Sequence, residues 1–558
     1  MTDMINSEME EININTEVLV IGGGLTGLKA ASEIAASGYK VSLIEKESDI
    51  GFQEETNYLF SVNKKELASF EKLIKQVKNN NQIEIFTQTQ IKRVTGVTGD
   101  FNVTLSKGNE LKGKNVGAIV IATNFSIKPL NEKYGLSLSK NVLTQSQMEE
   151  LLAPDNKAGR EKLANKTVAF VVGFAQDGYP LVMERVMRSV LTAEETDGCN
   201  AYVYAGDLKV ASDGLEMIYK NTRDNGATYF KLKEAPNISQ DGKTISFYDD
   251  VLRRDMELSP DLLVVEEAVC ADQSNEGLAE LLRIDMGPLG FLQKDNVHLF
   301  PVCSNREGIF VVGASREIQD LPLIWTDVEN VSLNVKNLLG DGTRMVPKEK
   351  AVVDTGKCVF CLTCYRCCPH GAIYWDEDNK AVISKIACQA CGICASECPM
   401  DAIQIGGFKD EDIKVEIQKC IETGNNEPNI LAFCCQNSAF EAGKMAEAFN
   451  MPLPAGLKMI KVPCAGKVDI DYILSAFVNG ADGVLVMTCH NGNCKSEQGN
   501  VFANMRVDDV HRMFEETGFE NDRLKYVTLA SNMGQDFSST VVDMERKVKE
   551  LGPSALRN

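Results

Sequence analysis

The sequence lacks the features that would carry a chain through a membrane, out of the cell or onto nucleic acid. No apolar run reaches the ~18 residues that span a bilayer, and residues 1–17 lack the basic and apolar regions of a signal peptide. Acidic residues outnumber basic residues by 79 to 58, which gives a net charge of −21 and no basic stripe for nucleic acid. We therefore expect a cytoplasmic chain that reaches the inner face of a membrane only through partner subunits.

Cysteine, by contrast, is abundant, and its spacing is the strongest signal in the chain. Eight of the 18 cysteines form two copies of the pattern C-x2-C-x2-C-x3-C-P. Bacterial ferredoxins use this spacing to bind two [4Fe–4S] clusters, and the fourth cysteine of each run binds the cluster of the other run. We therefore assign one cluster to Cys358, Cys361, Cys364 and Cys398, and the second to Cys388, Cys391, Cys394 and Cys368. Zinc knuckles, the alternative, share the C-x2-C spacing but not the doubled pattern.

A glycine-rich turn near the start of the chain indicates a dinucleotide site. A predicted strand over residues 17–21 leads into Gly22-Gly23-Gly24-Leu25-Thr26-Gly27, a helical pattern follows, and a second strand ends at Glu45. A G-x-G-x-x-G turn between strand and helix, with an acid about twenty residues on, is typical of dinucleotide binding. Later strands at 116–122 and 308–313 favour FAD over NAD. The predicted FAD contacts are Gly22, Gly23, Gly24, Thr26, Gly27, Glu45, Lys46, Gly51, Ala122, Thr123, Gly313 and Ala314.

A second turn of this type is degenerate. The strand 167–172 is followed by Gly173-Phe174-Ala175-Gln176-Asp177-Gly178, which lacks the glycine that lets the backbone approach a phosphate. A bulky Phe174 and an acid of this turn would face the phosphates instead, so we expect the unit to serve in packing or docking. Because no C-x2-C pair precedes Cys358, a thioredoxin-reductase-like dithiol is also absent. The flavin should therefore exchange electrons with clusters.

The last part of the chain alternates strands and helices, which predicts a doubly wound parallel sheet. Cysteines follow the carboxyl ends of its first three predicted strands, and such ends meet in one crevice. Four of these thiols could hold one [2Fe–2S] cluster: Cys435, Cys464, Cys489 and Cys494. The alternative is a set of buried thiols that pack as small hydrophobic side chains.

The predicted fold class is α/β in four units. A flavoprotein fold of the two-dinucleotide-binding type comes in two parts, around an inserted degenerate nucleotide-binding-like domain. A double [4Fe–4S] ferredoxin domain and a C-terminal doubly wound α/β domain follow. The predicted boundaries are 1–150 and 251–347 for the FAD-binding domain, 151–250 for the insertion, 348–408 for the ferredoxin domain and 409–558 for the C-terminal domain.

This order of parts resembles the A subunit of heterodisulfide reductase fused to the delta subunit of methyl-viologen-reducing hydrogenase. The resemblance covers nearly the whole chain and is carried by residues 21–27, 308–313, 462–469 and 480–494 together with the ferredoxin runs. The fused arrangement is most similar to the B subunit of the quinone-interacting membrane-bound oxidoreductase complex of sulfate-reducing microbes. That likeness implies electron transfer between a membrane quinone pool and adenylylsulfate reductase. The implied partners are adenylylsulfate reductase, a flavoprotein paralogue and a membrane quinone-interacting subunit.

The chain departs from the family pattern at positions near both kinds of cofactor. Phe52 and Asn124 stand where the family has glycine near the flavin, the insertion contains no family cysteines, and Ser438 replaces a cysteine of the delta subunit. These losses favour a simple relay. Two alternatives remain: an electron-bifurcating subunit that works with a hydrogenase or formate dehydrogenase, and a C-terminal module that only docks partners.

Overall fold

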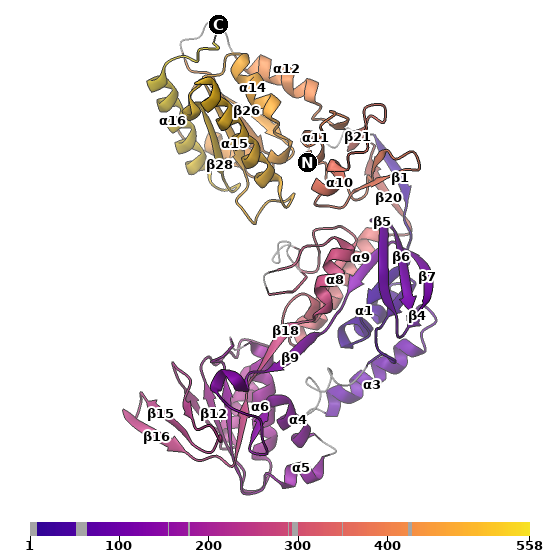
Figure 1. Cartoon of the computed structure of the whole chain (residues 1–558), viewed down its shortest axis with the longest axis vertical. Coiled ribbons are helices and arrows are strands. Elements are labelled where there is room, and N and C mark those ends of the chain that lie inside the picture. Colours follow the sequence, from indigo (N-terminus) through magenta and orange to yellow (C-terminus); the bar gives the residue numbers. More distant parts are fainter. Residues whose placement is uncertain are drawn as a thin grey trace.

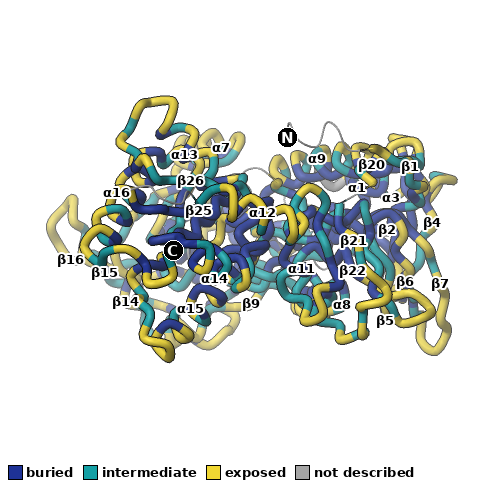
Figure 2. Tube along the Cα trace, turned by 90° about the horizontal axis from the view of Figure 1, so that it is seen from above, coloured by how far each residue is buried: buried dark blue, intermediate teal, exposed yellow. Residues whose placement is uncertain are grey.

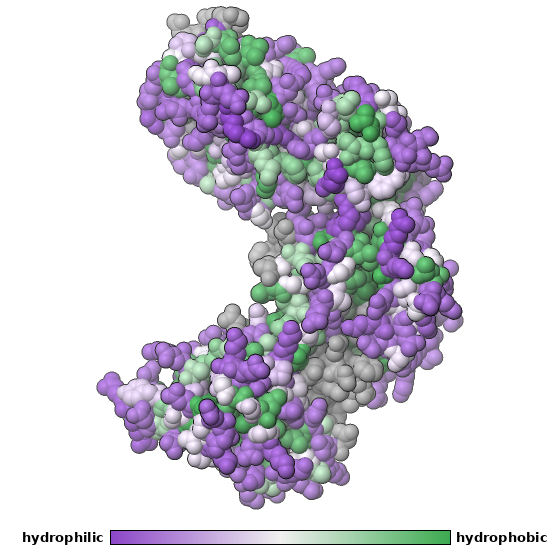
Figure 3. All heavy atoms as spheres, viewed as in Figure 1, coloured by the Kyte–Doolittle hydropathy of each residue, from purple (hydrophilic) through white to green (hydrophobic). Residues whose placement is uncertain are grey.

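The computed structural model describes residues 8–51, 64–153, 156–176, 179–287, 289–292, 300–348, 350–421 and 427–557. These residues form a crescent (Figure 1). The insertion lies at one end, the FAD-binding domain in the middle, and the ferredoxin and C-terminal domains at the other end. A space-filling view shows the hollow between the two ends of the crescent (Figure 3).

The FAD-binding domain is built on a parallel five-stranded sheet with the order β19-β8-β2-β3-β4. The strands are β2 (Val18–Ile21), β3 (Val41–Ile44), β4 (Ile83–Phe86), β8 (Ala118–Ile121) and β19 (Ile309–Val311). Every residue of β2, β3 and β8 is buried, as expected for parallel strands covered on both faces. The helices α1 (Leu25–Ala36), α3 (Lys64–Lys78) and α9 (Leu321–Leu339) lie on one face of this sheet.

The other face of this sheet packs against a three-stranded antiparallel meander and one helix. These elements are β5 (Gln90–Val97), β6 (Asp100–Lys107), β7 (Glu110–Val116) and α8 (Ser274–Leu282). The buried residues of β6 alternate along the strand, because its opposite face is open to solvent. The predicted α/β fold class is thereby confirmed for the first half of the chain.

The insertion is wider than predicted. Its parallel sheet has the order β10-β17-β11-β12-β13, and β10 (Val142–Thr144) and β17 (Leu262–Val265) lie outside the predicted range 151–250. The other strands are β11 (Thr167–Val172), β12 (Asn200–Ala205) and β13 (Thr228–Lys231). The boundary was wrong because β10 and β17 are short and acquire a partner only in the folded sheet. An antiparallel pair, β9 (Phe125–Pro129) with β18 (Glu267–Ala271), connects this lobe to the FAD-binding domain (Figure 1).

The ferredoxin domain has two similar halves. Each half contains a cysteine run that passes through one short helix, α10 (Thr363–Cys367) or α11 (Ile393–Ser396). Two antiparallel pairs complete the domain: β21 (Ala351–Val353) with β24 (Ile403–Ile405), and β22 (Ile373–Trp375) with β23 (Ala381–Ile383). Strand β20 (Thr343–Pro347), which leads into this domain, pairs with β1 (Met9–Asn13).

The C-terminal domain is the predicted parallel sheet, with the order β26-β25-β27-β28. Its strands are β25 (Ile430–Cys435), β26 (Leu457–Val462), β27 (Gly483–Thr488) and β28 (Leu524–Thr528). Its helices are α12 (Asp410–Cys420), α13 (Ala439–Ala448), α14 (Ile470–Val478), α15 (Gly499–Thr517) and α16 (Gly534–Leu551). Figure 2 shows the buried strands of this sheet and of the FAD-binding sheet inside their more exposed surroundings.

Candidate functional site

The first glycine-rich turn has the backbone contacts that only glycine permits. Gly22 has φ of +106°, and a Cβ atom there would lie 2.4 Å from the carbonyl oxygen of Ala122. A Cβ atom on Gly27 would lie 1.8 Å from the carbonyl oxygen of Gly22. The first and third glycines therefore let helix α1 start tightly against β2 and β8, which directs its first N–H groups to the carboxyl ends of the strands.

A cavity of about 670 Å³ opens at these carboxyl ends. Its volume lies in the range of small-molecule and cofactor sites. The predicted FAD contacts that line it are Gly22, Gly24, Glu45, Lys46, Ala122 and Thr123. The N-terminal half of α8 forms the opposite wall, with Asp272 and Ser274 at its start. Sequence reasoning missed this wall, because residues 272–281 carry no motif and reach the cavity only through the chain reversal after β18.

Glu45 is held in place by the backbone. Its two carboxylate oxygens accept hydrogen bonds from the N–H groups of Gly23 at 2.6 Å and Glu47 at 2.8 Å. Lys46 and Asp272 form an ion pair of 3.8 Å between the end of β3 and the α8 segment. The cavity thus presents a fixed carboxylate for a ribose hydroxyl and a lysine for an anionic group.

The other predicted FAD contacts position the turn without lining the cavity. The Gly51 N–H donates to the carbonyl oxygen of Gly23 at 2.8 Å. Gly313 packs against the side chain of Thr26, and its N–H donates to Asp327 at 3.0 Å. Burial raises the pKa of the Asp327 carboxyl, although Arg316 opposes the rise. Ala314 packs into the core of the insertion lobe.

The second glycine-rich turn is occupied by a side chain of the same chain. The Glu266 carboxylate accepts hydrogen bonds from the N–H groups of Gly173 at 2.7 Å, Phe174 at 3.2 Å and Ala175 at 2.8 Å. Tyr134 donates a further hydrogen bond to Glu266, and burial and this carboxylate raise the pKa of the tyrosine hydroxyl. Successive backbone N–H groups of this kind form an anion site. The carboxylate that these N–H groups bind is that of Glu266, which the sequence did not indicate. The acid of the turn itself, Asp177, lies outside the described residues.

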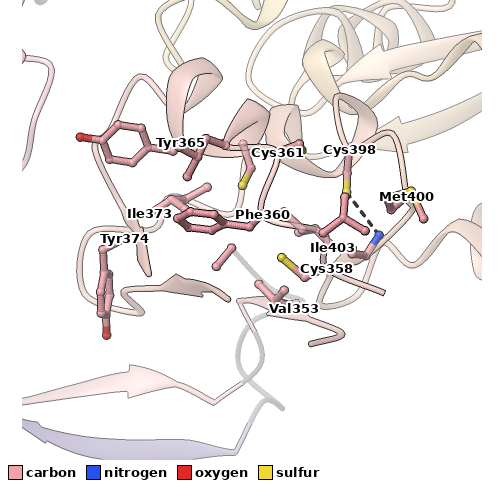
Figure 4. A pocket seen from close by; sticks show the side chains of 15 residues that line it. Val353, Cys358, Phe360, Cys361, Tyr365, Ile373, Tyr374, Cys398, Met400 and Ile403 are labelled. Atoms are coloured by element: carbon pink, nitrogen blue, oxygen red, sulfur yellow. Dashed lines mark hydrogen bonds between the residues drawn. The ribbon is translucent and has the colours of Figure 1, made fainter. Parts of the chain in front are cut away.

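Four cysteines from the two ferredoxin runs line one pocket (Figure 4). They are Cys358, Cys361, Cys364 and Cys398, which is the set expected for one cluster. Apolar side chains such as Phe360, Ile373 and Ile403 fill the rest of the wall. The N–H of Ala402 donates to the Cys398 sulfur at 3.4 Å. Cys361 is exposed, so this set lies at the surface of the ferredoxin domain.

The second set lies deeper in the molecule. Burial raises the pKa of the Cys394 thiol, and the neighbouring sulfurs of Cys391, Cys368, Cys388 and Cys367 raise it further, so Cys394 lies near the other three predicted ligands of the second cluster. Backbone N–H groups donate to the sulfurs of Cys368 and Cys388, each at 3.4 Å. Such N–H···S bonds favour the thiolate, which is the form that binds iron.

The C-terminal domain brings four buried thiols together. The sulfurs of Cys435 and Cys489 lie 3.7 Å apart, and hydrogen bonds from Cys464 and Cys489 lower the pKa of Cys435. Cys464 and Cys494 approach each other beside Gly499, where a Cβ atom would lie 2.2 Å and 3.5 Å from their sulfurs. The neighbouring Cys434 packs on the opposite face of the sheet, because side chains alternate along a strand.

Ser438, the residue that replaces a family cysteine, lies beside this group, with its hydroxyl 3.4 Å from the Cys489 sulfur. The four thiols are thus complete without position 438. Among the described residues, no group of three or more His, Cys, Asp or Glu side chains surrounds a single metal-ion position. The fit of each thiol set to a cluster therefore rests on which sulfurs converge.

The second ferredoxin run packs directly on the C-terminal domain. Cys391 contacts the hydrophobic core that contains the four C-terminal thiols. The Ser396 hydroxyl donates to the carbonyl oxygen of Lys467 at 2.8 Å, and Arg506 forms an ion pair of 2.5 Å with Glu397. No spacing in the sequence indicates this contact, because its partners are about 70 to 110 residues apart. The structure thereby joins two thiol sets across one interface.

Two family models match parts of the chain. Residues 430–552 match the delta subunit of methyl-viologen-reducing hydrogenase, and residues 2–152 match pyridine nucleotide-disulphide oxidoreductase. None of the helices in the described part of the chain combines the length and apolar character needed to cross a bilayer. Among solved structures, the thioredoxin reductase of Lactococcus lactis aligns with 58% of this chain and 99% of its own. Its sequence identity is 14% and its TM-score is 0.40.

One relative matches nearly the whole chain, and another matches about a quarter of it. The A subunit of the ferredoxin:CoB-CoM heterodisulfide reductase of Methanosarcina mazei is 23% identical over 96% of this chain and 80% of its own length. The iron-sulfur D subunit of the F420-non-reducing hydrogenase of Archaeoglobus profundus is 33% identical over 23% of this chain and 93% of its own length. The chain is therefore similar over nearly its whole length to the A subunit of heterodisulfide reductase, has an oxidoreductase fold of the FAD-binding type, and carries a C-terminal domain that belongs to the hydrogenase delta-subunit family.

Proposed function

We propose that this chain relays electrons among one FAD, two [4Fe–4S] clusters, one [2Fe–2S] cluster and partner redox subunits. The observation that carries the proposal is the convergence of three sets of four thiols. Two of these sets meet where Cys391 packs on the core of the C-terminal domain. When bound, the flavin supplies two-electron chemistry and the clusters supply one-electron chemistry.

The chain's own residues supply binding and orientation. The glycine turn and Glu45, at the carboxyl ends of β2 and β3, would hold the adenosine half of a bound FAD. The first thiol set lies at the surface, where Cys361 is exposed, and offers a route to a partner. The second set lies between the FAD-binding domain and the C-terminal thiols, which suits an internal step.

Electrons are expected to enter from a partner protein and not from a pyridine nucleotide. The turn that would bind the nucleotide phosphates gives three N–H groups to Glu266. A phosphate would have to displace this carboxylate from a position where it is 3% exposed. Reduction of the flavin by NADH or NADPH is therefore not part of the proposed cycle.

The finer part of the proposal concerns the partners. Relatives of this chain are subunits of heterodisulfide reductases and hydrogenases. The fused order of domains instead resembles the B subunit of the quinone-interacting membrane-bound oxidoreductase complex. We therefore propose a link between a membrane quinone pool and adenylylsulfate reductase, through a flavoprotein paralogue and a membrane subunit. Isolation of the native complex, with its subunits identified, tests this part separately.

The central test is an anaerobic count of flavin and iron in the full-length chain, with EPR spectra of the reduced protein. We expect about one FAD and about ten iron atoms per chain, with a [2Fe–2S] signal beside those of the cubane clusters. Cys464→Ala should remove about two iron atoms and that signal. Cys434→Ala is the matched control, because Cys434 is equally buried but lies on the opposite face of the sheet.

Each component of the proposal has its own contradicting result. A wild-type chain with about eight iron atoms, unchanged in Cys464→Ala, would reduce the C-terminal domain to a docking unit. A chain that purifies and reconstitutes without flavin would contradict the role of the first glycine turn.

A further inference from the structure

Two arginines lie at the joint between the FAD-binding domain and the ferredoxin domain. Arg306 is 6% exposed, and its guanidinium donates to the carbonyl oxygen of Leu282 at 2.5 Å. Arg283 donates to the carbonyl oxygen of Tyr365 at 2.8 Å and lies 4.0 Å from the centre of the Tyr365 ring. Among the described residues, no carboxylate forms an ion pair with either arginine.

Residues on both sides of Cys368 contact the two arginines: Tyr365 contacts Arg283, and Gly371 contacts Arg306. A Cβ atom on Gly371 would lie 2.3 Å from Nε of Arg306, so the glycine is required for this approach. The Asn305 side chain, next to Arg306, donates to the carbonyl oxygen of Pro369 at 3.1 Å.

A buried arginine needs a negative partner, because water no longer solvates its charge. The chain has 79 acidic residues, yet none of the described ones supplies that partner. The thiolate set that lies closest along this segment is that of Cys368, three residues before the Gly371 that packs against Arg306. A cubane cluster bound by four thiolates carries a net negative charge, and reduction adds one electron to it without breaking a bond.

The first thiol set has a different surrounding. Arg366 donates to the carbonyl oxygen of Cys361 at 3.1 Å, and Lys380 donates to that of Cys358 at 2.7 Å. Arg366 is exposed, so solvent and salt screen its charge. A positive charge in a buried setting interacts more strongly with a nearby cluster than a positive charge at the surface does.

We propose that Arg306, assisted by Arg283, raises the reduction potential of the cluster bound by the Cys368 set above that of the cluster bound by the Cys358 set. The internal cluster is then reduced first and receives electrons from the surface cluster or from the flavin. Arg306 is a positioning residue here, since it acts on the cluster through its charge. The inference rests on the proposed function, because it requires both cubane clusters.

The experiment is a dithionite-poised redox titration of the full-length chain, followed by EPR. The two cubane signals are first assigned with Cys361→Ala, which removes a ligand of the surface set. In Arg306→Gln we expect the internal cluster alone to become harder to reduce, by about tenfold in its equilibrium constant, or about 59 mV for one electron. Arg306→Lys should keep most of the wild-type potential. Arg366→Gln is the matched control and should change neither constant by more than about twofold.

Changes in the reduction potentials test the role of Arg306, whereas the number of cubane signals in the wild type tests the proposed function. Unchanged potentials in Arg306→Gln, or equal shifts of both clusters, would overturn the role of Arg306. If Arg306→Gln does not fold, Arg283→Gln replaces it, because Arg283 is only half-buried. This variant should lower the reduction potential of the internal cluster by a smaller amount, and an unchanged potential would overturn the inference. A wild-type chain without two cubane signals would contradict the proposed function instead.

Discussion

The glycine-rich turns after strands β2 and β11 have similar strand–turn–helix surroundings, but their backbone N–H groups face different partners. The turn after β2 opens on a cavity of about 670 Å³, and helix α1 has no side-chain cap at Gly24. The turn after β11 gives the N–H groups of Gly173, Phe174 and Ala175 to Glu266. Both turns are anion sites by backbone geometry. The difference shows that an internal carboxylate can satisfy a phosphate-binding turn and remove it from ligand binding.

The largest expected effect is the loss of FAD affinity when a side chain is added at the first glycine-rich turn. In Gly27→Ala the new Cβ atom would lie 1.8 Å from the carbonyl oxygen of Gly22, so the turn must shift. At a cost of about 3 kcal/mol, FAD affinity should fall about 100-fold. The measurement is flavin content and FAD titration of the deflavinated protein. Gly113→Ala is the control, because no atom lies within 4 Å of a Cβ atom there. Normal flavin content in Gly27→Ala would remove the steric argument for this turn.

Removal of the Glu266 carboxylate from the second glycine-rich turn should destabilise the protein. Glu266→Ala leaves three N–H groups without their acceptor at a position that is 3% exposed, and should lower the free energy of unfolding by about 3 kcal/mol. Thermal unfolding and limited proteolysis of the insertion measure the loss. Glu257→Ala, at an exposed position of the strand Arg254–Leu258, is the control.

Added pyrophosphate tests whether the second glycine-rich turn binds an anion once Glu266 is removed, as the first turn is expected to do. It should restore part of the stability of Glu266→Ala, because it supplies an anion to the turn, and should leave the wild type unchanged. If Glu266→Ala is as stable as Glu257→Ala, the carboxylate does not support the turn.

A smaller change is expected at the carboxylate beside the open turn. Glu45→Gln keeps one acceptor oxygen but loses the charge that binds the N–H groups of Gly23 and Glu47. A loss of about 1.4 kcal/mol corresponds to about tenfold weaker FAD binding. Flavin titration measures it, with Glu33→Gln on the outer face of α1 as the control. Unchanged affinity would mean that Glu45 only orders the backbone.

Local spacing was sufficient for much of the architecture. The bounds of β11 are those expected from the sequence, and the cysteine runs specify which four thiols line one pocket, Cys398 with the first run included. These features depend on residues close in sequence or on a repeated pattern with known wrapping. The predicted range of the insertion excludes strand β10 because this strand is three residues long and its sheet partner, β17, lies more than 100 residues away.

The α/β class, the glycine turn of the first lobe and the three thiol sets could be inferred from the sequence, because turns, periodicity and cysteine spacing are local properties of the chain. Three contacts were decided only by folding. Glu266 occupies the second turn, Arg306 lies against the Cys368 loop with no carboxylate of the described residues beside it, and Cys391 packs on the hydrophobic core that contains the C-terminal thiols. These contacts join residues about 60 to 110 positions apart. Their energy depends on burial and on the charges that folding brings together, and neither is written in a local pattern.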